Sequence, residues 1–146
     1  MDAATFPCGA WFEVMAADAV RRPDVYRQLG LADFRLAVEV ADGATSHTYG
    51  LVLDGYDVLF AGELDDVAGF EAEATITGPR PVWQEMVANI VTHGGADGSH
   101  TLNALTIAET PLRVVAADPV GRDKFFRYAE TLQTLFDALA HPVPVA

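Results

Sequence analysis

The spacing of apolar residues along the chain changes from a helical period to a strand period and back again. Between Phe6 and Leu31 the apolar positions fall near one face of a helix, and Pro23 interrupts this helix because proline disfavours helix in the residue before it. From Asp33 to Val40 apolar and polar residues alternate, a period of two that predicts a strand with one buried face. The chain is therefore expected to begin with helices and to continue into a sheet.

Three more strands are predicted after the first one. They cover Thr45–Leu53, Tyr56–Leu64 and Phe70–Thr77, and Asp54-Gly55 is a strong signal for a two-residue hairpin turn. Short turns imply that consecutive strands are antiparallel neighbours. In each of the last two strands the alternation places the apolar residues on one side. These are Tyr56, Val58, Phe60 and Leu64 in the third strand, and Phe70, Ala72, Ala74 and Ile76 in the fourth.

A helical period returns after the fourth strand. Helices are predicted over Pro81–Val91 and over a short segment that follows Ser99, and a fifth strand over Leu112–Ala117. Asp118 is a suitable N-cap for a terminal helix that continues to His141. This order predicts an α+β fold, in which a five-stranded, mainly antiparallel sheet has helices covering one face.

The chain of 146 residues has the length of one domain, and no repeat or linker divides it. We expect a single domain over residues 1–146. It would consist of a helical N-terminal piece (1–32), the sheet with its covering helices (33–141) and a tail (142–146).

The predicted helices carry many large apolar side chains, and all of them compete for one face of a small sheet. Ordinary core packing would account for most of them, and a ligand held between sheet and helices would account for the same pattern. From the residues alone these positions are core positions, and they become the candidate ligand-binding residues if sheet and helices enclose a cavity: Trp83, Met86, Ile90, Leu102, Leu105, Phe125, Leu132 and Phe136.

Composition and charge exclude several kinds of partner. The formal net charge is −12 at pH 7, and the sequence pI is near 4.4. Nucleic acid is therefore not expected as a partner, because binding it requires a basic face. Cys8 is the only cysteine, so neither an intrachain disulfide nor a cysteine zinc site can form. No signal peptide and no apolar run long enough to span a bilayer is present, so we expect a cytoplasmic protein without stable membrane insertion.

A few polar residues could carry chemistry. His47 and Tyr49 share one side of a strand and could transfer protons in a pocket, although a half-buried histidine at a strand end is the more ordinary interpretation. His93 and His100 flank Asp97, but their spacing matches no closed metal site. No nucleophile, metalloprotease or phosphate-loop motif occurs, so neither a metal nor a cofactor is expected.

The succession of elements resembles the sterol carrier protein 2 family. The matching features are the strand pair around Asp54-Gly55, the acidic strand Phe70–Gly78 that runs into a helix with Trp83, and the final strand and helix. The segment Thr101–Pro111 departs from the family pattern, because it contains no glycine or lysine where the family usually has a short Gly-Lys-Leu sequence. The ending Pro-Val-Pro-Val-Ala is not a peroxisomal address.

This resemblance implies a sheet and helices that enclose an apolar tunnel for sterols, fatty acids or acyl-CoA. The leading hypothesis is therefore non-catalytic binding or carriage of a fatty acyl, sterol, terpenoid or polyketide molecule. One alternative is a small cofactor-free enzyme, of isomerase or dehydratase type, that acts on an apolar substrate in the same cavity. The other is a structural module that forms a homodimer through its apolar surplus. We expect a binding protein rather than an enzyme.

Overall fold

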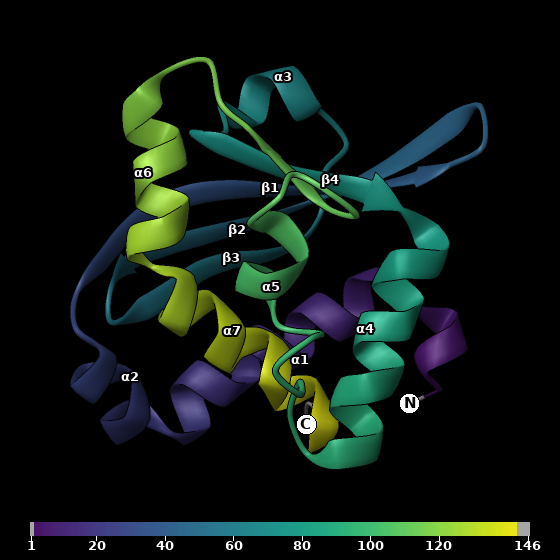
Figure 1. The fold of residues 1–146 in the computed structure, drawn as a ribbon. Helices are drawn as coiled ribbons and strands as arrows, with labels where there is room; N and C mark the ends of the chain where they lie inside the picture. The colour runs from purple at the N-terminus through teal and green to yellow at the C-terminus, as the bar shows by residue number, and fades with distance from the viewer. Residues whose placement is uncertain (1, 143–146) are drawn as a thin grey trace.

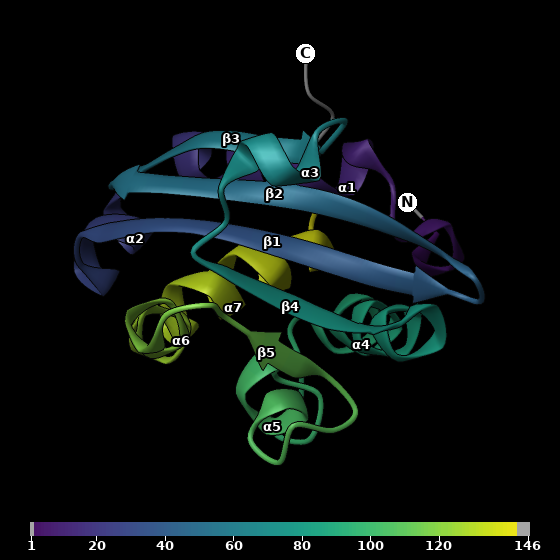
Figure 2. The same cartoon turned by 90° about the horizontal axis from the view of Figure 1, so that it is seen from above.

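Five strands form one mixed sheet in the order β3-β2-β1-β4-β5 (Figure 2). The computed structural model describes residues 2–142, so most of the predicted tail, residues 143–146, lies outside the described residues. The strands are β1 (Ala32–Asp42), β2 (Thr45–Gly55), β3 (Asp57–Glu63), β4 (Ala74–Pro79) and β5 (Arg113–Val115). Neighbouring strands are antiparallel except for β1 and β4, which are parallel. The predicted α+β architecture with a mainly antiparallel sheet is confirmed.

The helices lie mainly on one face of the sheet, which we call the inner face (Figures 1 and 2). They are η1 (Ala3–Thr5), α1 (Gly9–Arg21), α2 (Pro23–Leu29), α4 (Arg80–His93), α5 (Leu102–Thr106), α6 (Pro119–Arg127), α7 (Ala129–Asp137) and η2 (Ala138–Ala140). The short helix α3 (Val67–Phe70) lies on the opposite, outer face. None of the helices within residues 2–142 has both the length and the apolar character that spanning a bilayer requires.

A succession of short turns would require the fourth strand to pair with the third, but it does not. The segment after β3 contains α3, and the chain crosses the outer face before β4 pairs in parallel with β1. In that register Leu36 lies opposite Ala74 and Val38 opposite Ile76, so the apolar sides of the two strands meet on the inner face. The expectation of consecutive antiparallel strands is correct for β1, β2 and β3 and wrong for β4.

Two aromatic residues lie on the other face from the one that the alternation predicts. A bulge between Val52 and Leu53 shifts the register, so that Val58 faces inward while Phe60 pairs with Val52 on the outer face. Phe70 belongs to α3 instead of β4, and it too lies on the outer face. A period of two could not anticipate either change: the residue inserted in β3 reverses the face of Phe60, and Phe70 lies in a helix, to which a strand period does not apply.

The predicted terminal helix is two helices. Tyr128 leaves the helical region with φ −99° and ψ 15°, and it separates α6 from α7. The change of direction lets Phe125 in α6 lie in the core near the sheet while Phe136 in α7 reaches Phe12 in α1. The apolar stripe predicted for one long helix is thus divided between two axes.

The N-terminal helices belong to the same apolar core as the rest. Helix α1 packs beneath β3, and Phe12 stacks on Tyr49 of β2 with the rings parallel and their centres 4.6 Å apart. Phe6 and Trp11 are fully buried beside it. The N-terminal piece therefore covers the end of the inner face that α4 and α6 leave open.

Candidate ligand-binding site

The eight candidate residues come together on the inner face of the sheet. They come from α4, α5, α6 and α7, and each is at most 7% exposed. All eight belong to one continuous cluster of buried apolar side chains. None of them lines any of the three cavities described below. The structure thus places them in the expected layer, packed against other side chains, and contact with a ligand stays a prediction.

Aromatic rings occupy the centre of this layer. Phe136 stacks on Trp83 at 6.3 Å between ring centres and meets Phe12 edge-on at 6.5 Å. Phe6 adds a tilted contact with Trp83 at 6.3 Å. The indole nitrogen of Trp83 donates a hydrogen bond to the carbonyl oxygen of Gly78, so this large side chain leaves no unpaired polar group in the core. A guest molecule would therefore enter a layer that is apolar and aromatic.

One crevice reaches this layer from outside. It lies between α2, α7 and the ends of the first three strands, and it encloses about 10 Å³, room for about one water molecule. Its wall includes small residues beside large ones: Tyr26, Gly30, Ala32, Leu53, Gly55, Tyr56, Asp57, Val58, Thr131 and Leu135. Leu135 lies one helical turn from Leu132 in α7 and belongs to the same buried apolar cluster as the candidate residues, so the crevice borders that cluster. Sequence reasoning missed it because its wall comes from five separate elements.

A buried ion cluster holds α2 beside the crevice. The carboxylate of Asp18, only 1% exposed, accepts hydrogen bonds from Arg21, Arg22 and Tyr26 at 2.6 to 2.8 Å. Burial would raise the pKa of Asp18, but the hydrogen bonds from Arg22, Tyr26 and Arg21 outweigh it and hold that pKa below its usual value. Burial, together with the bond to Asp18, raises the pKa of Tyr26. The spacing of Asp18, Arg22 and Tyr26, four residues apart along helical sequence, is a signal that could have revealed this cluster.

A polar cleft lies on the other side of the same cluster. It has a volume of about 380 Å³ between the ends of α1, α4 and α7. Arg21, Arg22, Asp137 and His141 line it, and the carboxylate of Asp137 is already engaged by the backbone of Ala96 and the amide of Gln133. Both carboxylates of the cleft are thus satisfied, Asp18 by the two arginines and Asp137 by neutral donors.

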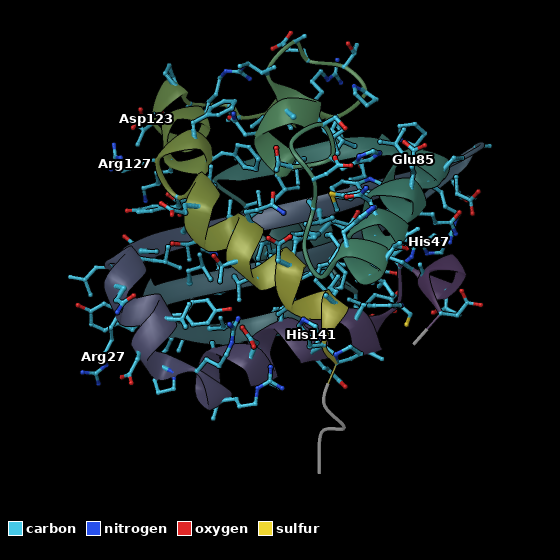
Figure 3. All side chains as sticks on the ribbon, turned by 60° about the horizontal axis from the view of Figure 1, so that its bottom comes forward. Arg27, His47, Glu85, Asp123, Arg127 and His141 are labelled. Atoms are coloured by element: carbon cyan, nitrogen blue, oxygen red, sulfur yellow. The ribbon has the colours of Figure 1, made fainter. Side chains whose placement is uncertain are left out.

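The proton-transfer candidates have contrasting surroundings. His47 is exposed near the β1–β2 turn, at the periphery of the molecule, instead of half-buried at a pocket (Figure 3). Tyr49 is 3% exposed, and burial raises the pKa of its phenol. No hydrogen bond joins the two side chains within the described part of the chain. The structure therefore does not bring them together as an acid–base pair.

The loop between His93 and His100 is closed by its own hydrogen bonds. Asp97 accepts bonds from His100, Ser99 and Asn89, and the first of these is the main reason that the pKa of Asp97 is lowered. The same contact raises the pKa of His100. Among residues 2–142, no three His, Cys, Asp or Glu side chains are grouped so that they could hold a metal ion.

Comparison with known proteins gives similarity in structure alone. No family model matches the chain, and no curated protein matches its sequence significantly. The crystal structure of sterol carrier protein 2 is similar with a TM-score of 0.66 and 16% identity, over 92% of this chain and 97% of that chain. A conserved hypothetical protein from Thermus thermophilus, possibly a sterol carrier protein, is similar with a TM-score of 0.64 and 16% identity, over 93% of this chain and 90% of that chain. The resemblance that the sequence indicates is confirmed at the level of the fold.

Proposed function

Because the chain has the fold of sterol carrier protein 2, we propose that it binds a hydrophobic small molecule between the inner face of the sheet and the covering helices. The observation that carries this proposal is the convergence of eight large apolar side chains from four helices on one sheet face. The ligand class is a fatty acyl chain, sterol, terpenoid or polyketide, since these molecules gain free energy in proportion to the apolar area that they bury. Carriage needs no cofactor, and we infer a cytoplasmic location from the sequence.

Binding in this layer requires side chains to move, because the crevice at α2 and α7 encloses only about 10 Å³. Residues there are small on the strand side, at Ala32 and Gly55, and flexible on the helix side, at Leu135. Met86 lies fully buried in the same core, and its unbranched thioether can adapt to a guest of irregular shape. We infer that a ligand enters at the crevice and displaces side chains of α7 toward α4.

The test is uptake of a fluorescent stearate by the purified, delipidated protein, together with mass spectrometry of lipids that copurify before delipidation. Phe136→Trp adds volume at the centre of the layer and should abolish uptake with the far-UV circular dichroism unchanged. Ile107→Trp is the matched control, because Ile107 is 71% exposed and the new indole would lie in solvent. Uptake by the control and not by Phe136→Trp supports the proposal.

A second variant keeps the test decisive if Phe136→Trp does not fold. Leu135→Ala enlarges the crevice, so it should take up the stearate more tightly than the unmodified protein. Two results would overturn the proposal: no uptake of fatty acid or sterol probes by the unmodified protein at micromolar concentration, or equal uptake by all the variants.

A further inference from the structure

The outer face of the sheet carries a groove that the inner-face proposal does not use. It lies between β3 and α3, has a volume of about 500 Å³ and is widely open to solvent. Its wall is mostly apolar: Val52, Leu59, Phe60, Leu64 and Phe70, with Arg35, Asp66 and Gly69. Figure 2 shows α3 on the face of the sheet that α4, α6 and α7 leave uncovered.

The groove has a rigid floor. A Cβ atom on Gly50 would lie 2.8 Å from the Phe70 ring and 2.9 Å from Leu64, so both side chains rest directly on the strand backbone. Asp66 caps α3 by accepting a hydrogen bond from the backbone nitrogen of Gly69 at 2.9 Å. Because the floor is held in place, the groove exists without a partner to shape it.

The rim presents apolar side chains to solvent. Leu59, the extra residue of the bulge, is 62% exposed, and Val67 and Phe60 are 49% and 41% exposed. The ring of Phe60 contacts that of Phe70, with ring centres 6.4 Å apart, and remains partly accessible to solvent. Leu59 and Phe60 both line the groove, and exposed apolar residues gathered at one groove commonly mark an interaction surface.

The charge around the groove is acidic. Residues 36–79 contain no lysine or arginine, and their acidic residues are Glu39, Asp42, Asp54, Asp57, Glu63, Asp65, Asp66, Glu71 and Glu73. Within residues 2–142, no basic side chain lies within ion-pair distance of Glu63, Asp65 or Asp66. Asp66 lines the groove, and Glu63 and Asp65 flank the wall residue Leu64. The one cation in the wall, Arg35, donates to the carbonyl oxygen of Phe70 and lies 4.5 Å from its ring centre.

These features select among possible occupants. An anionic membrane surface and a second copy of this chain would both bring negative charge against the acidic rim. A small molecule would stay largely exposed in so open a groove, whereas small-molecule sites bury most of their ligand. A protein segment with apolar side chains flanked by lysine or arginine satisfies both the apolar wall and the acidic rim.

We propose that the outer-face groove binds a basic, apolar segment of a partner protein, with Leu59, Phe60 and Phe70 as its apolar contacts and Glu63, Asp65 and Asp66 as its charge partners. The interaction is independent of ligand binding on the inner face, since the sheet separates the two sites. Its electrostatic part weakens with salt, and its apolar part persists.

The test uses a fluorescein-labelled peptide of sequence Lys-Leu-Lys-Phe-Lys-Leu-Lys, followed by fluorescence anisotropy. Leu59→Lys places a positive charge in the groove and removes an apolar contact, so it should weaken binding by about tenfold or more. Val20→Lys is the matched control, because Val20 is an 83% exposed apolar residue of α1 that lies outside the groove. It makes the same charge change and should alter affinity less than about twofold.

Mapping by amide NMR shifts completes the test. Shifts confined to Val52 and residues 59–70 on addition of the peptide support the proposal. Equal weakening by Leu59→Lys and Val20→Lys, or shifts spread over every acidic surface, would show general charge attraction and overturn it. A control peptide with serine in place of leucine and phenylalanine should bind at least about tenfold more weakly, and equal binding would also contradict the apolar role of the groove.

Discussion

The phenol of Tyr26 donates a hydrogen bond of 2.6 Å to the carboxylate of Asp18, which is almost completely buried. This bond joins α2 to α1, and the same carboxylate accepts bonds from Arg21 and Arg22. Helix α2 is short and contributes Tyr26 as its only buried residue. The position of α2, and with it one wall of the crevice, therefore depends largely on Asp18.

We predict that Asp18→Asn lowers the free energy of unfolding by about 2 kcal/mol. The substitution removes the negative charge to which Arg21, Arg22 and Tyr26 donate hydrogen bonds. Because the two arginines are partly exposed, they recover some hydration, so the loss of stability is smaller than for a fully buried ion pair. Urea unfolding followed by circular dichroism measures it. Asp123→Asn is the control, because Asp123 and Arg127 form an ion pair on the exposed side of α6 (Figure 3). A similar loss in both variants would contradict the special role of Asp18.

The stability that Asp18 provides should depend on pH in the acid range. Its pKa in the folded protein is lower than the usual value of 3.8, so the unfolded chain takes up the proton first as the pH falls. The advantage of the unmodified protein over Asp18→Asn should be complete above about pH 5 and should shrink as the pH falls below about 4. Unfolding curves of both proteins at several pH values test this, and a constant difference down to about pH 2 would refute it.

Close contact between α6 and Glu73, the residue before β4, gives a third prediction. A Cβ atom on Gly121 would lie 2.0 Å from the carbonyl oxygen of Glu73, a backbone atom that cannot move aside. Gly121→Ala should therefore cost about 2 to 3 kcal/mol of stability and lower the midpoint of thermal unfolding. At Gly9, the first residue of α1, a Cβ atom would meet nothing within 4 Å. Gly9→Ala should leave the midpoint of thermal unfolding unchanged or raise it slightly. A comparable fall of the midpoint in both variants would contradict the role of the close contact at Gly121.

The local pattern was sufficient wherever neighbours in sequence decide the outcome. Phe34, Leu36 and Val38 alternate with polar or small residues, and all three are buried on the inner face of β1. The N-cap at Asp118 accepts a hydrogen bond from the backbone nitrogen of Val120, as a helix start requires. The apolar face predicted for α4 is also confirmed, since Trp83, Met86 and Ile90 are fully buried.

The sequence pattern indicates some features of the candidate site and not others. The eight apolar residues could be chosen because helical periodicity assigns them to buried faces. The crevice could not, because Tyr26, Leu53 and Leu135 come from three elements far apart in the sequence. The exposure of His47 likewise depends on how far the covering helices extend along β2, and no local pattern encodes that.

By itself the sequence determined most of the helices and strands, α3 excepted, and which of their faces avoid water, because those choices follow from periodicity and from residues a few positions apart. The tertiary structure alone decided that β4 lies parallel to β1, that the chain turns at Tyr128, and that Phe60 and Phe70 lie on the outer face. These outcomes depend on a bulge, on a crossover and on packing between distant elements. Each outcome is decided by contacts between residues far apart in the sequence, and for Phe60 a single inserted residue in β3 is enough to change the face on which the side chain lies.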